Sequence, residues 1–209
     1  YRVNNKVCYK FDVEGRTTGM FRRMMNIKDR WLSYVDTTSL LPQIAYREIR
    51  EANYRLWETT TFKQGNDSLK VEYKKKPKDA YKPEFYKSPK SIHDIVSAYF
   101  YLRNIDYSKM NIGERVKVNA FLEDTVYPFE VIYKGKEVLK TEFGKVHALK
   151  LTPDMPNNDL FDGKESINIW LSNDQNRVPL KVEAKMFVGA VEMDIEKYEG
   201  LRYPLNFAK

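Results

Sequence analysis

The chain has 209 residues, of which 42% are hydrophobic and 14% aromatic, so it can bury a substantial core and is not of the disordered class. Its apolar runs last only a few residues, which excludes a membrane-spanning helix, since such a helix needs about 20 apolar residues. The net charge of +7 is concentrated in residues 74–90, where seven Lys stand against one Asp and one Glu. A basic field over the whole surface, typical of nucleic-acid-binding proteins, is therefore excluded too.

Alternation of apolar and polar residues predicts four strands in the first half of the chain. They are Trp31–Asp36, Gln43–Arg50, Tyr54–Phe62 and Leu69–Tyr73. The links between them are short or contain Gly, as in residues 63–67, which favours antiparallel neighbours.

Residues 91–104 have a different period. Their apolar side chains recur at helical spacing, and Ser91 and Asp94 form a capping-box pattern at the start, which predicts one amphipathic helix covering the core. The preceding residues 74–90 contain Pro77, Pro83 and Pro89. They are predicted to be a long connection without regular structure.

The second half again alternates with period two and predicts seven strands. They are Arg115–Leu122, Val126–Tyr133, Glu137–Glu142, Val146–Leu151, Ser166–Leu171, Leu180–Met186 and Ala190–Tyr198. No crossover helix stands between them, so all pairs are predicted to be antiparallel. The expected fold is mainly β: a meandering antiparallel sheet curled into a barrel-like or two-half wrapped form. One domain over 1–209 is expected, with β-rich halves at 1–73 and 105–209 joined by the connection and the helix.

Three tryptophans are candidate ligand-binding residues. Trp31, Trp57 and Trp170 lie in separate predicted strands. A curled sheet can enclose an apolar cavity for one small or lipid-like ligand. The alternative is that all three belong to the core.

The basic segment 74–90 is a candidate polyanion site. Its lysines alternate with Tyr81, Phe85 and Tyr86, and such a pattern suits an anionic polysaccharide, a lipid headgroup or a nucleic acid. No nucleic-acid-binding motif accompanies it, so a nucleic-acid partner is not expected. The candidate residues are Lys74, Lys75, Lys76, Lys78, Lys82, Lys87 and Lys90.

No set of residues with catalytic or metal-binding spacing stands out. His93 is expected to cap the helix at the surface, and His147 is expected to be an ordinary strand residue. Cys8 is the single cysteine, which excludes an intrachain disulfide. Residues 154–163 are rich in Asp and Asn but lack the spacing of a calcium loop. Neither a catalytic residue, nor a metal, nor a cofactor is expected.

The polar run 173–177, NDQNR, lies between two alternating stretches. Asp174 is its only carboxylate, whereas paired-acid hydrolysis needs two. Asn and Asp favour reversals of the chain, so this run is predicted to be a hairpin tip in which Arg177 is held by Asp174.

Seven stretches of the chain form a recognisable set: DRWLSYVD (29–36), LLP (40–42), IREANY (49–54), DIVSAYFYLRN (94–104), GERVKV (113–118), FGKVHALKLTP (143–153) and IWLSNDQNRVPLKVEAKMFVGAVEMDIEKYEGL (169–201). Together they resemble a domain-of-unknown-function family common among exported proteins of Bacteroides-type and other Gram-negative bacteria. The resemblance covers the chain from about Arg22 onward, and the last stretch is the most specific. Asn173 and Ala52 depart from the pattern, where an acidic residue and Gly are usual. The family's opening strands are expected to be absent or altered before Arg22.

The resemblance implies a barrel-like YmcC-like fold and an exported protein, periplasmic or associated with the outer membrane; it carries no catalytic residues. The leading expectation is therefore a non-enzymatic cell-envelope protein that binds an apolar or lipid-like ligand or a protein partner of the envelope. Recognition of anionic envelope polysaccharide or lipopolysaccharide through residues 74–90 is the alternative, and an envelope hydrolase is a minor one.

Overall fold

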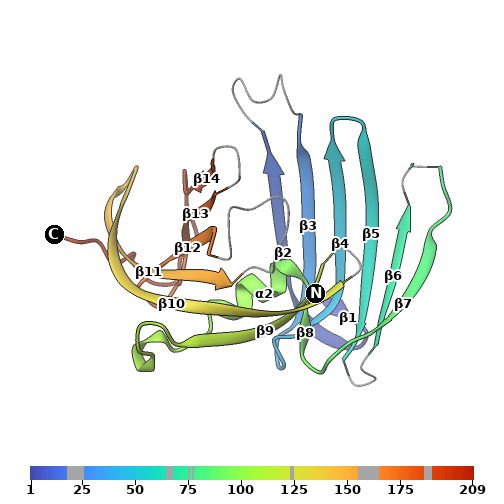
Figure 1. Cartoon of the computed structure of the whole chain (residues 1–209), viewed down its shortest axis with the longest axis horizontal. Helices are drawn as coiled ribbons and strands as arrows, with labels where there is room; N and C mark the ends of the chain where they lie inside the picture. Colours follow the sequence, from blue (N-terminus) through green and yellow to red (C-terminus); the bar gives the residue numbers. More distant parts are fainter. Residues whose placement is uncertain are drawn as a thin grey trace. The chain divides into compact units, whose positions relative to one another are not determined.

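Two seven-stranded sheets make up most of this computed structural model, which describes residues 1–17, 26–64, 68–74, 76, 78–122, 125–154, 165–185 and 190–209 (Figure 1). Strands hold 62% of the residues and helices 6%, and both sheets are strongly curled, which confirms the predicted fold class. The chain divides into two compact units. The first is Tyr1–Leu102 with Asn119–Tyr127, and the second is Arg103–Val118 with Pro128–Lys209.

The first sheet is a meander in which each strand pairs antiparallel with the next along the chain. Period-two alternation gives it one buried face, with Ser33, Ile49 and Phe62, and one face that is half-buried to exposed. The four predicted strands correspond to β3 to β6. The elements are β1 (Arg2–Val3), β2 (Lys6–Arg16), β3 (Lys28–Asp36), β4 (Pro42–Glu51), β5 (Tyr54–Lys63), β6 (Ser68–Lys74) and β7 (Lys82–Lys87).

Strands β1 and β2 correct the expectation that the opening strands are missing before Arg22. Strand β2 pairs with β3 from Cys8 opposite Asp36 to Arg16 opposite Lys28. The signal was present in the sequence, because charged residues alternate with Phe11 and Val13 along β2.

Strand β7 corrects the expectation that residues 74–90 lack regular structure. It pairs with β6 from Lys87 opposite Ser68 to Lys82 opposite Tyr73. It lies at the edge of the first sheet, where the missing N–H of Pro83 is tolerated because only one side of the strand is paired.

The predicted helix is confirmed, but it starts later than its sequence pattern indicated. Helix α2 (Ile95–Leu102) is preceded by Ser91 at φ 58° and by the short strand β8 (Ile92–His93). Strand β8 pairs parallel with Asn119 and Ala120 of β9 (Arg115–Leu122). The expectation of antiparallel pairs throughout is wrong here, because α2 and the 3-10 helix η1 (Tyr107–Lys109) supply the crossover that a parallel pair requires.

The second sheet has the order β14-β13-β12-β11-β10-β9-β8. Two predicted strands, Val126–Tyr133 and Glu137–Glu142, form one strand, β10, whose register shifts between Tyr133 and Gly135. The last strand ends at Asp194 and not at Tyr198. The remaining elements are β10 (Thr125–Thr141), β11 (Gly144–Asp154), β12 (Ile167–Ser172), β13 (Pro179–Lys185) and β14 (Ala190–Asp194).

The turn between β4 and β5 contains a non-glycine residue in the left-handed region. Ala52, in the turn between β4 and β5, has φ 43°, a left-handed conformation that Gly adopts more readily than Ala. In the described ranges no helix combines the length and apolar character needed to cross a membrane.

Candidate functional site

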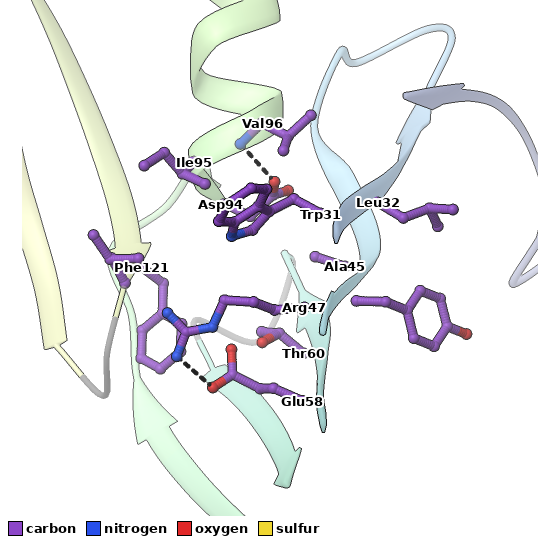
Figure 2. A pocket seen from close by; sticks show the side chains of 12 residues that line it. Trp31, Leu32, Ala45, Arg47, Glu58, Thr60, Asp94, Ile95, Val96 and Phe121 are labelled. Carbon is purple, nitrogen blue, oxygen red and sulfur yellow. Dashed lines mark hydrogen bonds and ion pairs between the residues drawn. The ribbon is translucent and has the colours of Figure 1, made fainter. Parts of the chain in front are cut away.

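A small pocket of the first unit lies between the first turn of α2 and the buried face of the first sheet (Figure 2). Its lining includes Trp31, Arg47, Glu58, Asp94 and Phe121. The volume of about 30 Å³ has room for one or two water molecules. Ligand pockets usually measure roughly 300–1,000 Å³, so a lipid chain does not fit in this one.

Asp94 is the most enclosed charged group of the pocket. Its Oδ1 accepts the backbone N–H groups of Val96 (2.9 Å) and Ser97 (3.1 Å), and its Oδ2 accepts the hydroxyls of Ser33 and Ser97 (2.7 Å each). The Asp94 N–H in turn donates to Ser97 Oγ (3.0 Å). This is a reciprocal capping box, three residues later than the Ser91 and Asp94 pattern predicted. Burial raises the pKa of Asp94 against the lowering effect of these bonds.

Arg47 and Glu58 face the same pocket from paired positions on β4 and β5. Arg47 Nη2 lies 3.1 Å from Glu58 Oε2, and the two side chains are 14% and 11% exposed. Figure 2 shows this ion pair and the bond from Val96 to Asp94 as separate dashed contacts in the pocket wall. The charges that line the pocket are thus engaged with other groups of the protein.

His93 is buried, so the expectation that it caps the helix at the surface is wrong. It is 3% exposed, and burial lowers its pKa to about 4. The ring centroid lies 5.1 Å from that of Tyr101. Both Ser33 and Ser97 donate directly to Asp94, which is not a catalytic triad, because His would have to stand between the hydroxyl and the carboxylate.

The exposed face of the first sheet brings together two of the predicted candidate residues. Trp57 on β5 pairs directly with Lys74 on β6. Lys74 Nζ lies 5.9 Å from the centroid of the Trp57 ring and 4.7 Å from that of Tyr81, within the range of cation–π attraction. The Trp57 indole N–H also donates to Glu48 Oε1 (3.0 Å).

Further rings continue this face toward the first strands. Tyr34 lies edge-to-face with Tyr1 (5.6 Å) and with Tyr46 (6.3 Å). Burial raises the pKa of Tyr46, and the neighbouring Tyr34 and Tyr81 raise it further. We call the rings of Tyr1, Tyr34, Tyr46, Tyr81 and Trp57, with the Lys74 ammonium, the aromatic band.

The carboxylates around the aromatic band are engaged by cations. Asp12 accepts from Arg30 Nη2 (2.6 Å) and pairs with Lys10 (3.0 Å), and Arg30 holds its pKa well below the usual range. Glu72 pairs with Lys70 (3.0 Å), and Glu48 bonds Arg50 as well as Trp57. An anionic ligand would therefore meet carboxylates whose charge is already compensated.

The other candidate residues are dispersed. Trp31 lines the small pocket, and Trp170 is 4% exposed in the core of the second unit with Val146, Ala148 and Leu180. Lys82 and Lys87 are on opposite faces of β7, because they are five residues apart on one strand. Lys75 lies outside the described residues. The exposed lysines of the segment are Lys76, Lys78, Lys82, Lys87 and Lys90.

The predicted hairpin tip at 173–177 is confirmed between β12 and β13. Asp174 Oδ1 accepts the N–H groups of Asn176 (2.8 Å) and Arg177 (3.3 Å), but the Arg177 guanidinium bonds Asn173 Oδ1 (3.3 Å) and not Asp174. Asn176 also exchanges two hydrogen bonds with the backbone of Tyr203 (2.7 and 3.0 Å). The tip anchors the C-terminal segment.

Within the described part of the chain, no group of three or more His, Cys, Asp or Glu side chains is arranged to hold a metal ion. Most of the Asp- and Asn-rich stretch 154–163 lies outside that part.

Comparison with known proteins places the chain in a family. The family described as "Protein of unknown function (DUF3108)" matches residues 2–196. The chain belongs to this family. The match begins at residue 2, so β1 and β2 are part of the DUF3108 domain. Neither the curated proteins nor the solved structures contain a match.

Proposed function

We propose that this DUF3108 protein is a non-enzymatic component of the Gram-negative cell envelope, exported to the periplasm or the outer membrane, and that its aromatic band binds anionic envelope polysaccharide. The observation that carries the proposal is the Lys74 ammonium beside the rings of Trp57 and Tyr81 on an exposed sheet face. Aromatic rings can stack on the C–H faces of sugars, and the ammonium can attract a carboxylate or phosphate of the same chain.

The composition of the face favours a polysaccharide over a protein partner. Charged side chains alternate with the rings on neighbouring strands, whereas the centres of protein interfaces are depleted in Lys, Glu and Asp. The segment that begins at Lys74 adds a local charge of +5, from seven Lys, one Asp and one Glu. That charge complements an acidic polymer.

A lipid-like ligand inside the protein remains a prediction. The size of the pocket and the position of Trp57 do not favour it. The pocket at Trp31 has a volume of about 30 Å³. Trp57 is on the other face of the sheet, since it pairs with Glu48 and not with Arg47.

The test is titration calorimetry of the purified protein with lipopolysaccharide and with polygalacturonate, at ~0.05 M and ~0.5 M NaCl. We expect binding that weakens with salt, and a loss of about tenfold for Lys74→Ser and for Trp57→Ala, which is 1.4 kcal/mol. Lys197→Ser, which removes an exposed charge of the second unit, and Tyr54→Ala should bind as the wild type does.

Failure to bind either polymer, or binding that salt and Lys74→Ser leave unchanged, would contradict the proposal. Native mass spectrometry of the gently purified protein distinguishes the alternative, because a bound lipid would support the lipid-like ligand.

A further inference from the structure

Three rings of the aromatic band and its ammonium lie on four successive strands and not along one strand. Tyr34 is on β3, Tyr46 on β4 and Trp57 on β5, while Lys74 is on β6. Neighbouring strands are about 4.8 Å apart, so the band from Tyr34 to Lys74 crosses roughly 14 Å of sheet. This span exceeds what one sugar ring bound at Trp57 would cover.

The register places the rings close enough to act together. Tyr46 is opposite Thr59, two residues from Trp57, so Tyr46 and Trp57 are diagonal neighbours on one face. Tyr34 is opposite Ile44, two residues from Tyr46, and the ring centroids of Tyr34 and Tyr46 are 6.3 Å apart. Each ring is therefore a diagonal neighbour of the ring on the next strand.

We infer that the polysaccharide is bound as an extended chain lying across the strands, with an acidic group at Lys74 and the following sugars over Trp57, Tyr46 and Tyr34. This inference rests on the proposed function and adds the form of the ligand. At the β6 end of the band, the Lys74 ammonium contacts the rings of both Trp57 and Tyr81. The ring pair of Tyr34 and Tyr46 takes the uncharged part of the repeat.

Charge compensation along the path supports an acidic chain. Asp12, Glu48 and Glu72 flank the band, and each is held by a cation of the same face. An acidic polymer that crosses β3 to β6 is thus not repelled at short range. It gains the attraction of the segment that follows Lys74.

The experiment is calorimetry with hyaluronan and polygalacturonate fragments of increasing length. Affinity should rise with length and then level off once the band is covered. Tyr34→Ala should lower the affinity for the longest fragment by about threefold to tenfold and leave that for a disaccharide unchanged. Trp57→Ala should lower both.

Tyr34→Phe keeps the ring and should restore binding, which separates loss of stacking from loss of folding. Tyr54→Ala is the matched control, because Tyr54 is 48% exposed on β5 but has the opposite strand parity to Trp57. Sedimentation with a long polysaccharide should show several protein molecules on one polymer. This is expected if the protein binds internal stretches of the polymer and not only its ends.

If Trp57→Ala weakens binding while Tyr34→Ala and fragment length have no effect, the site takes a single sugar: the inference is overturned and the proposed function stands. If neither polymer binds at any length, both are overturned.

Discussion

The two faces of the first sheet use the same strands and opposite side chains for different purposes. On the buried face, Ser33, Arg47, Glu58 and Asp94 bond one another or the backbone. On the exposed face, Trp57 lies beside the Lys74 ammonium, and Tyr46 is exposed to solvent. The polar groups of the pocket thus hold the helix cap and the ion pair in place. If the proposed function is correct, binding belongs to the side chains that face outward, and variants of the two faces test this division.

The largest effect is expected from Asp94→Ala, at the cap of α2 that bonds Ser33 on the buried face. The variant loses a helix cap, and the Ser33 hydroxyl loses its buried acceptor, so the free energy of unfolding should fall by about 3–4 kcal/mol. Urea denaturation measures it. Asp94→Asn keeps a capping oxygen and should lose only about 1 kcal/mol. Equal losses for Ala and Asn would show that the capping box is not the source of the stability.

The second effect is a dependence of stability on pH that originates at His93. The unfolded pKa is near 6.5, and burial lowers the folded pKa to about 4. Between these values the unfolded state binds more protons, so the stability present above about pH 6.5 is lost as the pH falls toward 4. His93→Phe should remove up to about 3 kcal/mol of this acid sensitivity.

The raised pKa of Asp94 acts in the opposite direction, since protonation of that carboxyl favours the folded state as the pH falls. Asp94 is present in both proteins, so the difference between wild type and His93→Phe isolates His93. Urea denaturation at several pH values gives the two curves. Parallel curves would mean that the pKa of His93 is the same in the folded and unfolded states, which contradicts the prediction.

A smaller effect is expected from the ion pair in the pocket. Arg47→Met removes the guanidinium that pairs with Glu58, whose side chain is 11% exposed. The free energy of unfolding should fall by about 2 kcal/mol. The double variant Arg47→Met with Glu58→Met removes both charges and should regain at least half of that loss. A double-mutant cycle by urea denaturation decides this. Additive losses would show that the two groups act independently, and that the pair does not belong to a structural network.

Much of the fold was predictable because period-two alternation is a local property. It identified β3 to β6 and most of the second sheet, and helical spacing identified α2. The edge strand β7 was missed, because its Lys and Pro content indicates a connection, and the sequence does not show that an edge strand tolerates both.

The candidate site was predictable only in its parts. The residue pattern alone predicts a cavity position for Trp57 and a connection for Lys74, because the register of β5 and β6 decides which residues stand opposite each other. His93 was misplaced for a similar reason: its burial follows from the parallel pairing of β8 with β9. Such non-local pairing leaves no pattern in the residues around it.

The smallest effect on stability is expected from variants of the edge strand β7. The same variants test whether the lysines of the basic segment protect the sheet edge or bind the ligand. Lys82→Val, Pro83→Val and Lys87→Val together should change the free energy of unfolding by no more than about 0.5 kcal/mol. Aggregation should nevertheless increase, since Lys and Pro on an edge strand prevent pairing with other chains. Light scattering at rising protein concentration measures it.

The control replaces Lys76 and Lys78 by Val, which removes the same charge from exposed positions outside β7. If only the β7 variant aggregates while its affinity for polysaccharide is retained, these lysines protect the edge and Lys74 alone of the segment serves the exposed face. If the β7 variant instead loses binding as strongly as Lys74→Ser, the ligand reaches beyond the aromatic band to the edge strand. Binding is then not confined to the exposed face of β3 to β6.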